Sequence, residues 1–159
     1  LVGKEGDGFK IAMQGLDGGR INIASCSLGA ARFCIEKTIN YINERKQFGK
    51  YLKDFQSIQF KLADMITEFE AAKLMVHKAA LAIDKKENSS TIMSAMAKRY
   101  ATDVCFKICN EALQIHGGYG YLSDFGIEKM VRDCRVHQIL EGTNEIMRVI
   151  ISRKILERD

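Results

Sequence analysis

Proline is missing from all 159 residues of the chain. The commonest helix breaker is therefore absent, and long uninterrupted helices are allowed. No apolar run approaches the roughly 18 residues expected of a membrane span. The opening "LVGKEGDGF" is charged and glycine-rich, unlike a signal peptide. It reads as a linker entering a domain, so we expect a domain of a longer protein.

The chain also lacks a large excess of charge of either sign. The chain has 24 basic and 20 acidic residues, a net charge of +4, and the two signs are mixed along the sequence. This balance does not favour nucleic-acid binding, although it suits a negatively charged cofactor. The hydrophobic share of 47% is typical of one soluble globular domain.

The five cysteines form no CxxC pair. They are predicted to be buried free thiols in a reducing compartment. Cys105 and Cys109 share a helix face, but no second ligand pair accompanies them, so no metal site is predicted.

Apolar residues recur at spacings of three and four along most of the chain, which indicates helices. Strand signals are weak. The expected helices run from after "LDGGR" toward Gly49, from Asp54 or Gln56 to about Asp84, from Ser89 or Ser90 to Gly117 and Gly118, from about Gly126 to Val136, and from Thr143 or Asn144 to about Glu157. The fold class is therefore all-α, an antiparallel up-down bundle of about four main helices.

Two motifs have simple structural interpretations. In "LDGGR", Asp17 caps a helix and Arg20 pairs with a surface acid, although two glycines also suit a close backbone approach. In "ERKQFG", Arg45 stabilises a helix C-terminus, and Phe48 makes a capping contact.

The motif "QIHGGYGY", residues 114–121, carries three glycines where one would end a helix. Such a loop lets a phosphate or another chain approach the backbone closely. It is neither a Walker loop nor a Rossmann fingerprint. His116 is a residue of the helix end rather than a ligand.

The motif "HQILEGTNEI" spaces His137, Glu141 and Glu145 by four, as in helical metal sites. Gly142 and Thr143 break the helix between the two acids, so no metal is predicted. Glu141 is left at a junction between helices, after an apolar pair. It is either a solvated loop residue or a general base whose pKa is raised by its apolar surroundings.

Taken in order, "RKQFG", a glutamine eleven residues after its arginine, "QIHGGYGY", "RD" and "LEGTNEI" resemble the motif series of the C-terminal helical domain of acyl-CoA dehydrogenases. The resemblance implies oxidation of an acyl-CoA to its 2,3-enoyl-CoA. A glutamate removes the α-proton, FAD takes the β-hydride, and electron-transfer flavoprotein takes the electrons. Glu141 matches the base. Within the family the motifs look closest to members that act on isobutyryl-CoA, with butyryl-CoA and 2-methylbutyryl-CoA as alternatives.

The resemblance also implies binding roles, residue by residue. The residues on the substrate side are Asp17, Gly18, Gly19, Arg20, Gly142 and Arg153. The residues on the FAD side are Arg45, Phe48, Phe55, Gln56, Thr143, Asn144, Glu145 and the loop Gln114, Ile115, His116, Gly117 and Gly118, which meets the FAD of a neighbouring subunit.

The family has an N-terminal helical domain and a middle β-domain that this sequence lacks. Residues 1–14 are accordingly expected to be the linker from the β-domain, and residues 15–159 the bundle. Alone, the chain is expected to bind FAD weakly or not at all and to be inactive, but to associate as the core of a homotetramer. A mitochondrial matrix location follows for a eukaryotic source, and a cytoplasmic one otherwise. A non-catalytic helical oligomerisation module is the rival interpretation.

Overall fold

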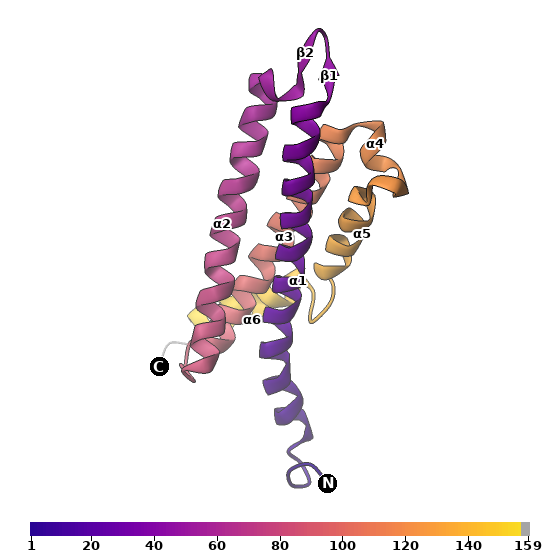
Figure 1. The fold of residues 1–159 in the computed structure, drawn as a ribbon. Coiled ribbons are helices and arrows are strands. Elements are labelled where there is room, and N and C mark those ends of the chain that lie inside the picture. Colours follow the sequence, from indigo (N-terminus) through magenta and orange to yellow (C-terminus); the bar gives the residue numbers. More distant parts are fainter. Residues whose placement is uncertain (157–159) are drawn as a thin grey trace.

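The structure, a computed structural model, describes residues 1–156. Three long helices dominate it (Figure 1). The elements in order are α1 (Gly8–Glu44), β1 (Lys46–Gln47), β2 (Lys50–Tyr51), η1 (Leu52–Asp54), α2 (Gln56–Asp84), α3 (Ser90–His116), α4 (Gly118–Tyr121), η2 (Ser123–Phe125), α5 (Ile127–His137) and α6 (Asn144–Leu156).

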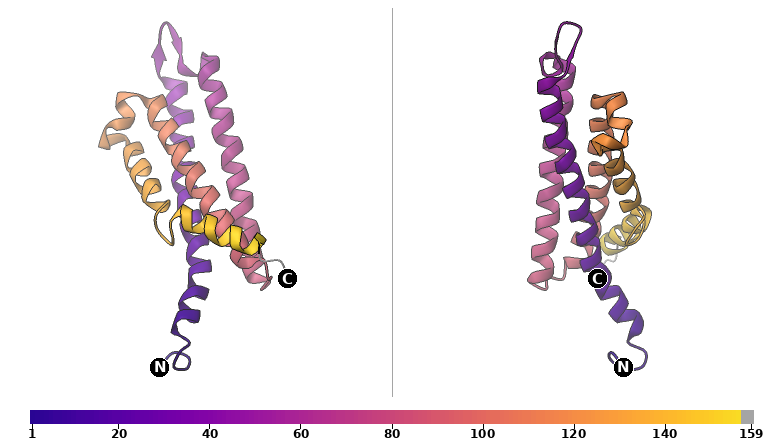
Figure 2. Two further views of the ribbon diagram at one scale, coloured as in Figure 1. Left: turned by 180° about the vertical axis from the view of Figure 1, so that it is seen from behind. Right: turned by 45° about the vertical axis from the view of Figure 1, so that its right-hand side comes forward.

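Consecutive long helices run in opposite directions along the long axis of the molecule, so that α2 is antiparallel to both α1 and α3, which confirms the predicted up-down bundle (Figures 1 and 2). Helix α3 is the central element, because it contacts α1, α2, α5 and α6. Helix α5 lies along α1 and α3, whereas α6 crosses α3 near the end where α3 begins (Figure 2). The loop between α5 and α6 is thereby held against the side of the bundle.

Helix α1 begins earlier than the sequence predicts. It starts at Gly8, so the prediction of a start after "LDGGR" is wrong. A glycine inside a helix costs only about 1 kcal/mol relative to alanine, and Asp17 pairs with Arg20 within the same helix rather than capping it. Residues 8–14 are therefore helical, although a connection to an upstream domain stays a prediction.

Helix α1 ends at Glu44, earlier than the predicted stop at Gly49, because the hairpin begins at Lys46. The remaining helix boundaries agree with prediction to within a residue or two, except that the predicted end near Glu157 lies outside the described residues. The hairpin β1–β2, which pairs Lys46 with Tyr51, was not predicted, and neither was the single turn α4. Both are too short to leave a periodic signal. Within residues 1–156, no helix is long and apolar enough to cross a membrane.

The core is built mainly from small side chains, which lets the helices approach closely. Its fully buried members include Ala24, Ala31, Ala72, Ala79, Ala95, Ala97, Ala101 and Ala112. Four of the five cysteines are buried free thiols, as predicted, whereas Cys26 is exposed. Burial raises the pKa of the Cys105 thiol, which therefore stays protonated and packs as a small apolar group.

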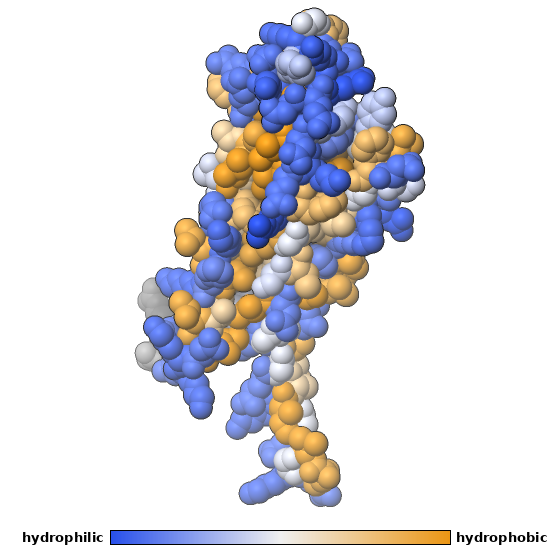
Figure 3. All heavy atoms as spheres, in the orientation of Figure 1, coloured by the Kyte–Doolittle hydropathy of each residue, from blue (hydrophilic) through white to orange (hydrophobic). Residues whose placement is uncertain are grey.

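Apolar side chains also remain exposed along the molecule, and a group of them lies on the first turns of α1, which project beyond the bundle (Figure 3). Phe9 is 77% exposed, and Ile11 and Met13 accompany it on the same helix. The opposite end, around the hairpin, is polar (Figure 3).

Candidate functional site

The turn between α5 and α6 carries the predicted base in an unusual backbone conformation. Glu141 has a φ of 56° and Gly142 a φ of 89°. Glycine adopts this left-handed region freely, but for glutamate it is uncommon and costs energy. Strained residues of this kind persist where the surrounding structure holds them, and they concentrate at functional sites. The turn is therefore a candidate site on geometric grounds alone.

The Glu141 carboxylate lies directly against Gly19 on α1. A Cβ atom added to Gly19 would stand 2.4 Å from Oε2 of Glu141 and 2.9 Å from its Cδ. Real side chains do not approach so closely, so the carboxylate occupies this position only because residue 19 has no side chain. The motifs "LDGGR" and "LEGT", remote in sequence, thus form one site.

Arg20 is buried beside this position and is only 6% exposed. Its Nη1 donates to Oδ1 of Asp17 at 2.6 Å, and the other Asp17 oxygen accepts from Thr91 on α3 at 2.6 Å. The Nε of Arg20 has no hydrogen-bond partner within the described part of the chain. A cavity of about 470 Å³ opens here, lined by Phe9, Lys10, Met13, Gln14, Asp17, Arg20, Thr91 and Ile150.

Behind the turn lies a buried polar network centred on Lys98 of α3. Its Nζ donates to the Gly142 carbonyl at 2.8 Å and to Oδ1 of Asn144 at 2.9 Å. The Asn144 amide in turn donates to Thr102 at 2.9 Å and to Asp103 at 2.7 Å. Asn144, predicted as a FAD contact, is 4% exposed here and holds α6 onto α3.

The remaining predicted residues around α6 are less closely joined to Glu141. Thr143 Oγ1 accepts from the Ile146 amide at 3.4 Å, as an N-cap does. Glu145 is exposed in the first turn, where its own backbone N–H and Thr143 lower the pKa of its carboxyl. Arg153 is exposed in the last turn of α6, and within residues 1–156 no hydrogen bond or ion pair joins it to the turn. Gly18 faces open space.

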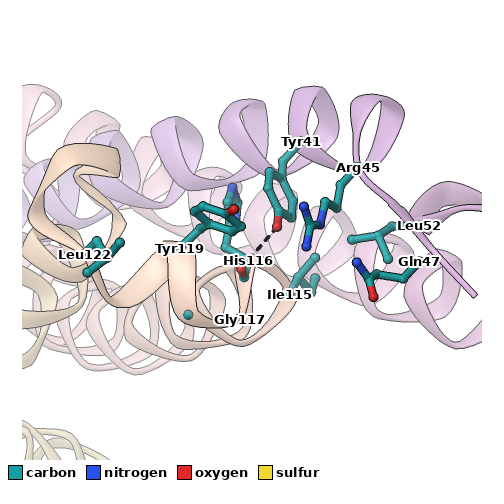
Figure 4. A pocket seen from close by; sticks show the side chains of 10 residues that line it. Tyr41, Arg45, Gln47, Leu52, Ile115, His116, Gly117, Tyr119 and Leu122 are labelled. Carbon is teal, nitrogen blue, oxygen red and sulfur yellow. Dashed lines mark hydrogen bonds between the residues drawn. The ribbon is translucent and has the colours of Figure 1, made fainter.

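A second cluster lies where α1 ends and α3 ends. A cavity of about 470 Å³ is lined by Tyr41, Arg45, Gln47, Leu52, Ile115, His116, Gly117, Gly118, Tyr119 and Leu122 (Figure 4). The Tyr41 ring stacks on His116 at 4.3 Å, and the Tyr41 hydroxyl donates to the His116 carbonyl at 3.3 Å. The Arg45 guanidinium lies over the Tyr119 ring at 5.3 Å. Arg45 and most of the predicted glycine loop therefore share one cavity.

Some predicted residues of this cluster lie beside the cavity rather than in its lining. Phe48 is 91% exposed at the hairpin tip, with a φ of 53°. Its ring meets that of Phe55 edge-on, with centroids 6.4 Å apart. Gln56 at the start of α2 and Gln114 on α3 are both exposed. They remain accessible to a ligand or to another chain.

The structure thus places the predicted residues in two groups that lie far apart. Arg20 and Arg45 are about 37 Å apart along α1, at a rise of about 1.5 Å per residue. Sequence reasoning missed Tyr41, Gln47, Leu52, Thr91, Lys98, Thr102, Asp103, Tyr119 and Leu122. Gln47 and Tyr119 carried a signal, because they lie inside the motifs "ERKQFG" and "QIHGGYGY". Among the described residues, no group of three or more histidine, cysteine or acidic side chains could hold a metal ion.

Comparison with known proteins identifies the family of the chain. The sequence profile described as "Acyl-CoA dehydrogenase, C-terminal domain" matches residues 6–156. The mitochondrial isobutyryl-CoA dehydrogenase of Bos taurus is 54% identical over 98% of this chain, and the match spans 38% of that protein. Butyryl-CoA dehydrogenase from Megasphaera elsdenii superimposes with a TM-score of 0.95 at 45% identity, over 98% of this chain and 40% of that one.

A chain in the structure of the electron transferring flavoprotein of Acidaminococcus fermentans also superimposes with a TM-score of 0.95, at 44% identity. It covers 98% of this chain and 41% of that one. The present chain therefore spans about two fifths of the length of the relatives that it matches. On the profile, the identity and the fold together, the chain belongs to the acyl-CoA dehydrogenases, a family of oxidoreductases, and its helical bundle is their C-terminal domain.

Proposed function

We propose that this domain belongs to a FAD-dependent acyl-CoA dehydrogenase that converts isobutyryl-CoA to methacrylyl-CoA, with Glu141 as the base. The observation that carries the proposal is the Glu141 carboxylate seated against Gly19 in a strained turn. The 54% identity to the bovine isobutyryl-CoA dehydrogenase supports the choice of substrate.

Glu141 has the chemistry that the reaction needs. An α-proton next to a thioester is only weakly acidic, so its removal needs a positioned base in a water-poor site. Glu141 would take the α-proton while the β-hydride leaves, which yields the 2,3-enoyl-CoA. The buried Arg20 and the half-buried Asp17 line the adjoining cavity and would contact the CoA side of the substrate. Gly142 and Arg153 are proposed to contact it as well.

The residues of this chain do not enclose Glu141 fully. Ile139 and Leu140 precede it and are 49% and 42% exposed, and Glu141 itself is only half-buried. Much of the relatives' length lies outside the match. We infer that the apolar wall opposite Glu141 comes from that part of the enzyme, and that residues 1–159 alone have no turnover. A flavin absorbance spectrum of the isolated domain tests this, because stoichiometric bound FAD would contradict it.

The second cluster suits FAD. Residues 117 and 118 are glycines with nothing within 4 Å of an added Cβ, so a ligand can reach their backbone. Arg45 supplies a cation beside them for a phosphate. Bound FAD would supply the acceptor for the β-hydride. Phe48, Gln56 and Gln114 are exposed around the same end, Phe55 is half-buried there, and all four would add contacts.

The separation of the clusters supports assembly from several copies. Glu141 and the first turn of α6 lie at one cluster, and Arg45 with the glycine loop at the other. The distance of about 37 Å along α1 exceeds the length of one extended FAD. The same FAD can therefore contact both clusters only if two chains supply them. The argument requires at least two copies, and the proposed homotetramer meets this requirement; size measurement of the full-length enzyme would test it.

Replacing Glu141 by glutamine in the full-length enzyme tests the proposed base. The amide cannot accept the α-proton, so kcat should fall at least about a hundredfold. Glu36→Gln is the matched control, because Glu36 is an exposed acid on α1 that pairs with Arg32. Near-normal activity of Glu141→Gln would refute the base assignment. A non-catalytic oligomerisation module predicts no activity in the parent either.

The substrate and the partners remain open to direct measurement. One methyl group is worth only about 1–3 kcal/mol of discrimination, so kcat/KM should be compared for isobutyryl-, butyryl- and 2-methylbutyryl-CoA. A preference for either of the last two would overturn the isobutyryl assignment. Reoxidation of the reduced flavin by electron-transfer flavoprotein is the proposed second half-reaction. The rate of this reoxidation tests whether electron-transfer flavoprotein is the partner. The mitochondrial relative supports a matrix location, to be tested by cell fractionation.

A further inference from the structure

Lys98 is the largest fully buried side chain in the described part of the protein. It lies on α3, with 0% of its surface exposed, and both of its hydrogen-bond acceptors come from the segment after Glu141. These acceptors are the Gly142 carbonyl at 2.8 Å and the Asn144 side chain at 2.9 Å.

A buried ammonium is costly, because the interior solvates a charge poorly. Apolar residues of similar size at such positions often stabilise a protein, so stability alone does not account for a lysine here. The acceptors of Lys98 are a carbonyl and an amide oxygen rather than a carboxylate at hydrogen-bond distance. Such contacts orient groups more than they neutralise charge. The position of Lys98 therefore indicates that its role is to fix the conformation of the turn.

The turn needs such a constraint. Glu141 and Gly142 are consecutive residues in the left-handed region, and the conformation of Glu141 is strained. Lys98 binds the turn on its C-terminal side, while Asn144 is tied to Thr102 and Asp103 on α3. The backbone N–H of Asn144 donates to the Gln138 carbonyl at 3.1 Å, which closes the loop on its N-terminal side.

We propose that Lys98 is a positioning residue for Glu141. Through Gly142 and Asn144 it holds the turn in the conformation that seats the carboxylate against Gly19 and aims it at the α-carbon of the substrate. This inference rests on the proposed function, since it assigns Lys98 to the reaction that Glu141 performs.

The charge of Lys98 adds a pH dependence. Charged or titratable groups face it from each surrounding element: Arg20 on α1, Asp103 on α3, His137 on α5, Glu141 in the turn and Glu145 on α6. Burial lowers the pKa of Lys98 to about 8, against the attraction of the three acids. A neutral amine still donates two hydrogen bonds, but charge-assisted bonds are roughly twice as strong. The hold on the turn should therefore weaken as pH rises through about 8.

The test uses the full-length enzyme and follows exchange of the isobutyryl-CoA α-proton with deuterated solvent, alongside kcat, KM and flavin content. Lys98→Met should slow exchange and kcat about a hundredfold, as expected for a base misplaced by about 1 Å. KM should stay near the parent value, and both rates are taken per bound flavin, because Asn144 is itself a predicted FAD contact. Lys107→Met is the matched control, because Lys107 lies on the same helix, is exposed and pairs with Glu68 at 2.9 Å.

Lys98→Arg separates positioning from mere structural support. The guanidinium keeps its charge at high pH and should recover part of the exchange rate. It should also shift the alkaline decline of kcat/KM from near pH 8 to higher pH. An unchanged alkaline decline in Lys98→Arg contradicts the proposed role of the charge.

The remaining outcomes are also decisive. A Lys98→Met enzyme with the parent exchange rate overturns the inference and leaves the proposed function intact. If Lys98→Met does not fold, Thr102→Val decides, because it removes the hydroxyl that binds Asn144 and leaves Lys98 in place. Slower exchange supports the inference, and an unchanged rate overturns it. A parent enzyme that neither exchanges nor oxidises any acyl-CoA overturns both proposals.

Discussion

The two clusters of this bundle hold their functional residues in different ways. Around Glu141, a strained turn is fixed by buried hydrogen bonds from α3, and the acid fits only because Gly19 has no side chain. Around Arg45, the residues line an open cavity of about 470 Å³, and the glycine loop faces free space. The first cluster has the fixed geometry that proton transfer needs. The second has the accessible backbone and cation that binding needs, and variants at each should therefore fail differently.

The sharpest contrast should come from Gly19→Ala. The new methyl group would collide with the Glu141 carboxylate, which is the flexible end of its side chain and can swing away. We expect the fold to survive and kcat for isobutyryl-CoA to fall about a hundredfold. Flavin content should not change, because Gly19 is proposed to face the substrate rather than FAD. Steady-state kinetics and flavin absorbance of the full-length enzyme measure both.

Gly15→Ala is the control for Gly19→Ala. Gly15 lies one turn earlier on the same helix, and an added Cβ there meets nothing within 4 Å. Its activity should match the parent, and its stability should rise by up to about 1 kcal/mol. Parent-level kcat in Gly19→Ala would show that the observed position of Glu141 is not the one used in catalysis.

Arg45→Met should give the opposite pattern to Gly19→Ala: FAD binding should weaken, and the catalytic step should change little. Loss of the cation removes charge-assisted hydrogen bonds worth about 1.5–3 kcal/mol, so FAD affinity should fall about tenfold to a hundredfold. The kcat per bound flavin should change little. Titration of apoenzyme with FAD measures the affinity. Arg32→Met, which removes an exposed ion pair on the same helix, should leave it unchanged, and equal losses in both variants would contradict the assignment.

The sequence allowed most of the fold to be predicted, because its helices carry strong periodicity and end at glycines such as Gly117. The start of α1 was missed, since Gly18 and Gly19 indicated a break. The reason for glycine at residue 19 is tertiary, because the side chain of Glu141 needs the space. Glu141 was found through its motif, but the conformation of its turn was not.

Other residues of the two sites lie beyond the reach of local patterns. Lys98 is a buried lysine on the most enclosed helix, and Thr91 meets Asp17 across 74 positions in the sequence. Hydrophobic periodicity predicts which face of a helix is buried, and it cannot predict a polar side chain that is buried to hold a distant turn. Such contacts emerge only when α1, α3 and α6 come together.

The smallest expected effect is a pH dependence of the stability of the folded protein. Each cluster contains one histidine that can cause it. Burial lowers the pKa of His116, which stacks on Tyr41, and also that of His137, which is hydrogen-bonded to Ser27 at 2.9 Å. The folded protein therefore binds fewer protons than the unfolded chain. The stability that these histidines contribute is complete above the unfolded pKa of about 6.5 and is lost as pH falls below it. Thermal unfolding midpoints should thus drop between pH 7.5 and 5.5.

Two variants assign this drop to one cluster or the other. His116 is only 4% exposed, whereas His137 is half-buried, so His116→Gln should flatten the pH dependence more than His137→Gln does. His77→Gln, at an exposed position on α2, should leave it unchanged. A steeper drop in His116→Gln than in the parent would mean that His116 is protonated in the folded state. The Arg45 cavity, which His116 lines, would then carry an additional positive charge toward a bound phosphate.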